Sequence, residues 1–69
     1  MTRKNIIKAI QKQHGVPYFI AEDITDNLET DVAEYLDGNH KYDSLETLIA
    51  QYVTMPNRKT EEIVNALLY

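Results

Sequence analysis

The sequence predicts an all-α fold, namely one small domain of four helices arranged as an orthogonal array or a bundle. Apolar residues recur at three- and four-residue steps in four segments, which is the spacing of one helical face. Short breaks that contain glycine, proline or asparagine separate these segments. No window of five or more residues alternates apolar and polar side chains as a strand does. Because 69 residues suffice for one domain only, we expect a single unit over residues 1–69.

The first helix is expected over residues 2–14. Ile6, Ile7 and Ile10 form its apolar stripe. Thr2 is a suitable N-cap, because a threonine hydroxyl accepts a hydrogen bond from one of the free backbone N–H groups. Gly15 is the expected left-handed residue that ends the helix.

The second helix is expected over residues 17–37, with Pro17 at its first position. Asp31 and Glu34 have the spacing of a capping box, which indicates a new helix start near Thr30. One long helix and two short ones therefore both remain open, and we favour one helix with a kink near Thr30. Its expected apolar residues are Ile20, Ile24, Leu28, Val32, Tyr35 and Leu36.

The third helix is expected over residues 44–54 and the fourth over residues 58–68. Asp43 and Glu46 have capping-box spacing at the start of the third helix. A proline breaks the pattern after this helix, and Asn57 is the expected cap of the fourth. The apolar residues of these two segments are Leu45, Leu48, Ile49, Tyr52 and Val53, then Ile63, Val64, Leu67 and Leu68.

Charge is unevenly distributed along the chain. The formal net charge is -4, and seven acids with no lysine or arginine among them lie between Glu22 and Asp37. The rest of the chain has four acids and seven bases. We therefore expect an acidic centre with basic flanks, and the net charge argues against general affinity for nucleic acid.

Several functional classes are disfavoured by composition. The chain has no cysteine, which excludes disulfides and thiolate metal sites. No apolar stretch reaches the roughly 18 residues that span a bilayer, and no apolar core of a signal peptide follows the first charges. We expect a cytoplasmic protein that does not contact a membrane.

Catalysis and metal binding have little support in the sequence. The one serine, Ser44, lies at a helix start, where capping explains it. His40 lies near Asp37, but the sixth and twelfth residues counted from Asp37 are Tyr42 and Leu48, which do not fit a calcium loop. Four short helices also leave little room for a pocket of about 300 Å³ or more. We predict no catalytic residue, no cofactor and no metal site.

The favoured function is that of a non-catalytic regulatory or adaptor-like protein that binds an unidentified protein with a basic patch. Tyr18 and Phe19 are consecutive and point about 100° apart on a helix, so one of them is expected outside the core as an apolar anchor. Glu22, Asp26 and Glu29 are the carboxylates expected to attract the basic partner.

Self-association is a secondary expectation. The sequence stops directly after the apolar face of the last helix. We expect such an end to be docked, either on the domain's own core or on a second copy. A homodimer would then form through Leu67, Leu68 and Tyr69.

Two alternative functions remain. Lys4, Lys8 and Lys12 form a basic stripe on the first helix, with Arg3 nearby. A nucleic-acid-binding module would place these four residues against phosphates. The favoured explanation of this stripe is pairing with the acidic second helix, or simple solvation. The second alternative is an inhibitor whose acidic helix imitates the phosphates of nucleic acid.

Overall fold

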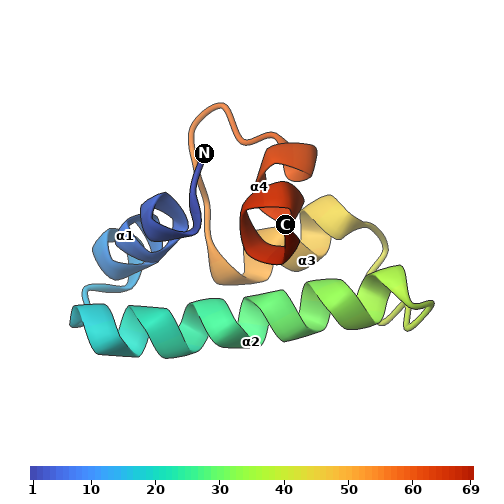
Figure 1. Cartoon of the computed structure of the whole chain (residues 1–69), viewed down its shortest axis with the longest axis horizontal. Coiled ribbons are helices and arrows are strands. Elements are labelled where there is room, and N and C mark those ends of the chain that lie inside the picture. The colour runs from blue at the N-terminus through green and yellow to red at the C-terminus, as the bar shows by residue number, and fades with distance from the viewer.

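A computed structural model describes all residues from Met1 to Tyr69 and confirms the all-α, four-helix fold. The longest helix, α2, forms the base of the molecule, and the three shorter helices pack on one side of it (Figure 1). α1 and α4 run across α2 rather than along it, so the arrangement is an orthogonal array (Figure 1). The helices are α1 (Arg3–His14), α2 (Tyr18–Leu36), α3 (Leu45–Tyr52) and α4 (Thr60–Leu68).

Local sequence signals correctly predict where α1 begins and where it ends. The Thr2 hydroxyl accepts a hydrogen bond from the Asn5 N–H at 3.3 Å, which confirms the predicted cap. Gly15 has a φ of 64° and its N–H donates to the carbonyl of Gln11 at 2.9 Å. Pro17 is the N-cap of α2 rather than its first helical residue, since its ψ of 160° is extended.

α2 is one helix of 19 residues, so the two-helix alternative is wrong. Figure 1 shows no break near Thr30, whose hydroxyl donates to the carbonyl of Asp26 at 3.1 Å. Asp31 does not begin a new helix. It accepts a hydrogen bond from the Tyr52 hydroxyl on α3, so its carboxylate joins two helices.

α3 is shorter than the predicted segment 44–54. Ser44, rather than Asp43, is its N-cap, and the Ser44 hydroxyl accepts from the Thr47 N–H at 3.1 Å. Val53 is extended and fully buried. Its burial therefore comes from packing of an extended residue after α3 and not from a further helical turn.

The fourth helix begins at Thr60, two residues later than predicted. Asn57 is not its cap. The φ of Asn57 is 54°, which belongs to a left-handed turn and not to the extended conformation of an N-cap residue. Lys59 takes the capping position without a side-chain hydrogen bond.

The core differs from the predicted apolar stripe of α2 at both ends. Ala21 and Thr25 are fully buried, whereas Leu36 is 51% exposed and Ile20 only half-buried. Ala21 and Thr25 have small side chains and belong to the first half of α2, and α1 crosses that half (Figure 1). The core consists of Ile6, Ile7, Ile10, Ala21, Leu28, Val32, Leu48, Ile49, Val53, Ile63 and Leu67.

None of the four helices combines the length and the apolar character that a bilayer-spanning helix needs.

Candidate interaction surface on helix α2

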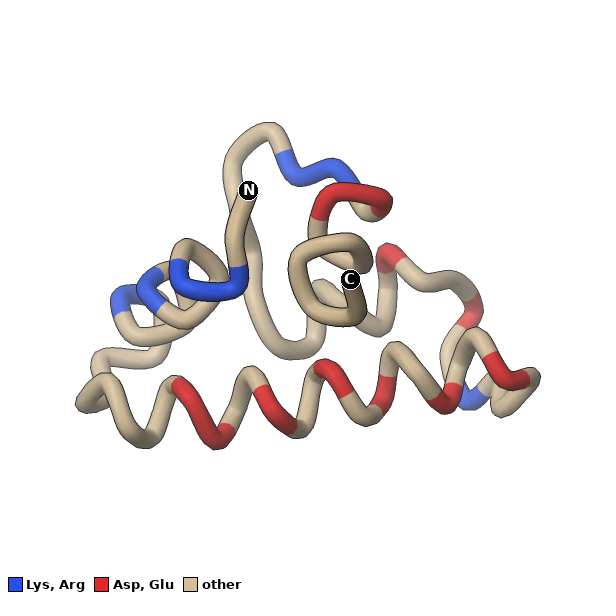
Figure 2. Tube along the Cα trace, in the orientation of Figure 1, with Lys and Arg blue, Asp and Glu red and all other residues tan.

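The side of α2 that faces away from the other helices carries mostly carboxylates. Figure 2 shows acids along the length of this helix and bases on α1. Six exposed positions follow one another at steps of three or four residues, so they lie in one line along the helix. We call this line the outer face of α2; it consists of Phe19, Asp23, Asp26, Thr30, Glu34 and the cap residue Asp37.

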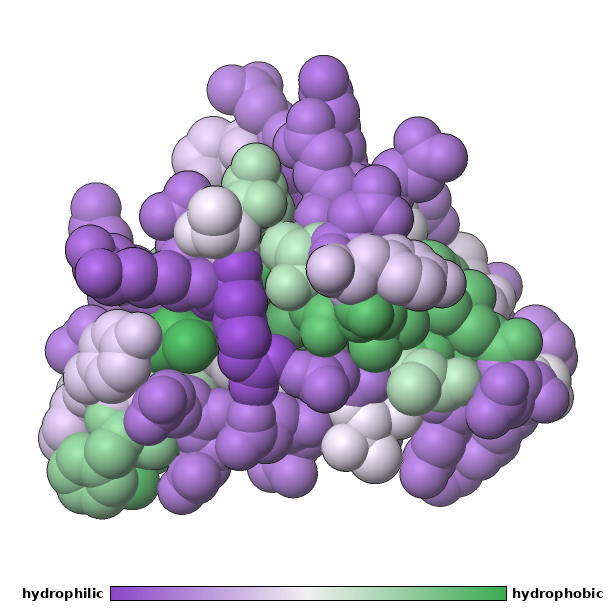
Figure 3. Space-filling model, in the orientation of Figure 1, coloured by the Kyte–Doolittle hydropathy of each residue, from purple (hydrophilic) through white to green (hydrophobic).

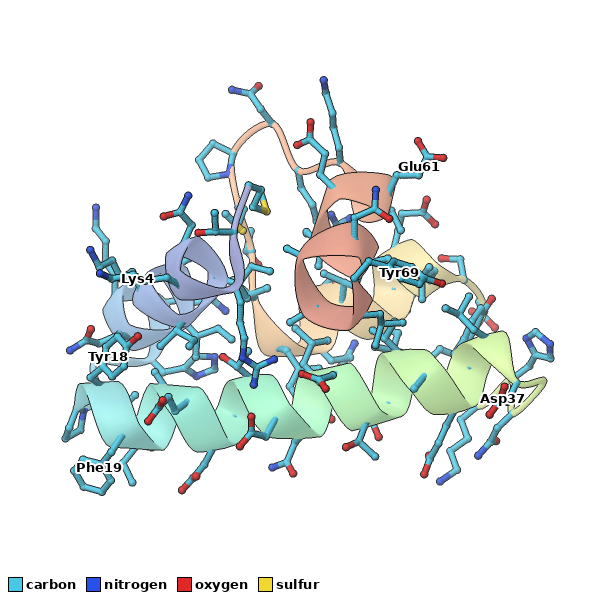
Figure 4. All side chains as sticks on the ribbon, in the orientation of Figure 1. Lys4, Tyr18, Phe19, Asp37, Glu61 and Tyr69 are labelled. Carbon is cyan, nitrogen blue, oxygen red and sulfur yellow. The ribbon has the colours of Figure 1, made fainter.

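The outer face begins at an exposed aromatic side chain. Phe19 is 63% exposed and Tyr18 is 39% exposed. Phe19 points away from the body of the molecule, whereas Tyr18 lies on the side of α2 nearer to α1 (Figure 4). Apolar surface also appears at the Phe19 corner of the space-filling view (Figure 3). Of the two predicted anchors, Phe19 is therefore the more accessible to a partner.

Two of the predicted carboxylates already have a partner within the chain. The Arg3 guanidinium donates to Asp26 and to Glu29, and so joins the start of α1 to the middle of α2. The Arg3 side chain is 34% exposed, the Asp26 side chain 65% and the Glu29 side chain 40%. Glu29 is consequently a contact between helices more than a free surface charge. Glu22 is exposed and forms no ion pair.

Sequence reasoning did not select three residues of this surface. Asp23, Glu34 and Asp37 are exposed and form no ion pair within the chain. The signal was present, because counting in steps of three and four from Phe19 reaches each of them. The predicted set Glu22, Asp26 and Glu29 has steps of four and three residues and follows a line nearer to α1, where Arg3 contacts Asp26 and Glu29.

A second contact holds the other flank of α2. The Tyr52 hydroxyl on α3 donates a hydrogen bond to the Asp31 carboxylate. Burial raises the pKa of the Tyr52 hydroxyl above its ordinary range, and the hydrogen bond to Asp31 raises this pKa further. Arg3 on one flank and Tyr52 on the other thus fix the rotation of α2 about its axis, with the outer face turned to solvent.

The basic stripe of α1, defined here as Lys4, Lys8 and Lys12, is exposed along its length. None of the three lysines forms an ion pair with α2. The predicted pairing of the first two helices is therefore made by Arg3 alone, and the three lysines are solvated. The structure thus presents separate basic and acidic helices (Figure 2).

The three residues predicted for self-association have different surroundings. Leu67 is only 6% exposed and belongs to the core of its own molecule, so it does not offer a surface to a second copy. Leu68 is half-buried against that core, and Tyr69 is 92% exposed. An open groove of about 360 Å³ lies near this end of the molecule, lined by Leu36, Leu45, Glu46, Thr60, Glu61, Val64 and Asn65.

The region around His40 shows no cluster of ligands. The imidazole of His40 meets the ring of Tyr35 edge-on, with 4.8 Å between ring centroids. No group of three or more histidine, aspartate or glutamate side chains is arranged to hold a metal ion. The pocket nearest this loop is small, about 60 Å³, and is lined by Asp31, Glu34, Asn39, Lys41, Tyr42 and Leu48.

Comparison of the chain with protein-family models, with curated proteins and with solved structures gives no match.

Proposed function

We propose that this chain is a non-catalytic regulatory or adaptor-like protein that binds a basic surface of another protein through the outer face of α2. One observation carries the proposal. The outer face is a continuous exposed line in which Asp23, Glu34 and Asp37 have no counter-charge within the chain, and it begins at the exposed Phe19.

The two kinds of side chain have different roles in such a contact. Surface carboxylates attract a basic partner and raise the rate of encounter, but exposed ion pairs contribute little to affinity. An aromatic residue that becomes buried at the centre of an interface contributes much more. Phe19 therefore supplies affinity, and the carboxylates that follow it along the helix supply orientation and selection of the partner.

The test is affinity capture from a lysate of the host cell with two variants of equal charge. Asp23→Lys/Glu34→Lys reverses two carboxylates of the outer face that have no partner in the chain. Each reversal adds two charges, so the double variant changes the net charge from -4 to 0. We expect it to lose the proteins captured by the natural chain.

The matched control is Asp43→Lys/Glu61→Lys, which also brings the net charge from -4 to 0 but leaves α2 unchanged. Both control positions are exposed. We expect this variant to capture the same proteins as the natural chain. Equal loss in both variants would show that only net charge matters, and equal capture by both would place the binding surface elsewhere.

A second candidate function has one observation in its favour. The basic stripe of α1 is exposed and unpaired, as a helix that contacts phosphates would be. A gel-shift titration on duplex DNA at low and moderate salt tests it. Binding that weakens steeply with salt and is lost in Lys4→Gln/Lys8→Gln/Lys12→Gln would favour this function over the first.

A further inference from the structure

An open groove lies beside the basic stripe of α1. Its volume is about 570 Å³, and it runs between the outer side of α1 and the extended segment that follows α3. Its floor is largely apolar, and Lys12 lies on its wall. We call it the α1 groove; its lining residues are Ala9, Lys12, Gln13, Thr54, Met55 and Pro56.

The two walls of this groove are joined to each other. The Gln13 side-chain carbonyl accepts a hydrogen bond from the Thr54 N–H, and the His14 imidazole is hydrogen-bonded to the Tyr52 carbonyl at 2.8 Å. These contacts fix the end of α1 against the extended segment. The two walls of the groove are therefore joined to each other in the folded chain.

We propose that the occupant of the α1 groove is the Phe19 end of α2 from a second copy of this chain. The chemistry of the two surfaces is complementary. The groove offers apolar surface beside Lys12, and the Phe19 end offers an exposed aromatic ring with Asp23 one helical turn further on. The inference rests on the proposed function, because it identifies a second copy of the chain as one basic partner of the same outer face.

Charges of opposite sign lie beside the groove and beside Phe19. Lys4, Lys8 and Lys12 follow one another at four-residue steps, which is about 6 Å of helix per step. On the outer face, Asp23 and Asp26 are three residues apart, about 4.5 Å, as are Glu34 and Asp37, and Thr30 separates the two pairs. With Phe19 seated in the groove, Lys12 lies beside Asp23 of the neighbouring α2, and Lys8 adds positive charge one helical turn away.

The contact is between two different surfaces, so it does not close on itself as a twofold dimer does. Phe19 points away from its own molecule (Figure 4), and it is not among the residues that line the groove of the same chain. A head-to-tail contact of this kind adds copies in a row unless its rotation closes a ring. A partner protein that occupies the outer face of α2 would then compete with assembly.

Sedimentation velocity over a range of concentrations at low salt tests this inference on the natural chain. We expect the mean mass to rise with concentration past that of a dimer, and to fall when salt is raised. Phe19→Ala removes the occupant, and Lys8→Glu/Lys12→Glu reverses the charge of Lys12 on the groove wall and of Lys8 one helical turn before it. Each is expected to weaken association by about tenfold or more, as loss of a central anchor does. All three positions are exposed, so we expect both variants to fold, and circular dichroism checks that they do.

A mixture of the two variants gives the decisive result. The Phe19→Ala chain keeps an intact groove, and the Lys8→Glu/Lys12→Glu chain keeps an intact Phe19 end. One natural contact forms between them and neither chain extends it, so we expect a mass that stops at two chains. Leu36→Ala, an exposed leucine at the other end of α2, is the control and is expected to associate as the natural chain does.

A natural chain that stays monomeric throughout, or a mixture that fails to form the capped pair, overturns the inference. Loss of association in Leu36→Ala would also overturn it, by placing the contact at the other end of α2. If the chain is monomeric but Asp23→Lys/Glu34→Lys still abolishes capture from lysate, only the second copy is refuted and the proposed function stands.

Discussion

Tyr52 and Asp31 show how single residues position the surface of α2. The hydroxyl of Tyr52, the last residue of α3, donates a hydrogen bond to the carboxylate of Asp31 on the flank of α2. Both residues are partly buried. A hydrogen bond to a charged acceptor contributes about 1.5 kcal/mol or more to stability. The pair therefore stabilises the orientation of α2 about its own axis in which the outer face is exposed to solvent.

The raised pKa of Tyr52 predicts how stability depends on alkaline pH. The unfolded tyrosine loses its proton near its ordinary pKa of 10.0, whereas the folded one holds it to higher pH. The contribution of Tyr52 is therefore complete below pH 10 and is lost as the pH rises toward the folded pKa. Tyr52→Phe should cost about 1.5 kcal/mol at pH 7, and the difference from the natural chain should shrink above pH 10.

Urea unfolding of both chains between pH 7 and pH 11 measures this prediction. The other tyrosines titrate in both chains, so the difference between the two curves isolates Tyr52. A difference that is constant with pH would show that the hydroxyl is not held in its protonated form by the fold.

Residue-level features were predictable from sequence where their cause is local. The Thr2 cap and the Gly15 turn depend only on neighbouring backbone groups, and both predictions are confirmed. Asn57 was predicted as a cap but occupies a left-handed turn. Asparagine suits both positions, and the path of the chain from α3 to α4 decides between them. That path depends on tertiary packing, so no local sequence pattern predicts it.

Among the helices, α2 has one face that packs in the core and one face that is exposed to solvent. Leu28 is fully buried in the core, while Leu36, two turns further along, is 51% exposed. Both leucines were assigned to the apolar stripe from sequence. Their difference arises because α2 extends past the other helices at its C-terminal end (Figure 1). Length of a helix relative to its neighbours is a tertiary property, so periodicity alone did not separate the two residues.

The two leucines provide a matched test of this view of α2. Leu28→Ala should cost about 2 to 5 kcal/mol through lost burial and a cavity. A domain of 69 residues has only roughly 3 to 10 kcal/mol in total, so this variant should be largely unfolded or close to it. Leu36→Ala should change stability by less than about 0.5 kcal/mol. Thermal unfolding followed by circular dichroism compares them, and similar losses would contradict the assigned rotation of α2.

Arg3 is the ionic link between the elements α1 and α2. Its pairs with Asp26 and Glu29 are partly exposed, so we expect Arg3→Gln to cost no more than about 1 kcal/mol at low salt. At about 1 M salt the cost should nearly vanish, because charges are then screened within about 3 Å. Urea unfolding at both salt concentrations measures it, with Lys4→Gln as the unpaired control. A cost that persists in high salt would mean that the side chain acts by packing and not by charge.

For the whole molecule, the separation of acidic and basic segments was predictable from the sequence. Which of these charged residues pair with each other was not. The acidic segment and the basic flanks became an acidic α2 and a basic α1, as expected (Figure 2). That Arg3 and not the lysines reaches α2 depends on where α1 crosses it. Of the five predicted binding residues, Phe19 and Glu22 are free on the surface, and Tyr18 lies nearer to α1. Asp26 and Glu29 already have a partner.

The central claim is that another protein contacts the outer face of α2. A photoreactive amino acid at Thr30, in the middle of that face, tests it in the living host cell, with the same group at the exposed Gln51 of α3 as control. We predict a discrete covalent adduct from position 30 and none from position 51. An adduct from position 51 alone, or no adduct from position 30, would contradict the claim.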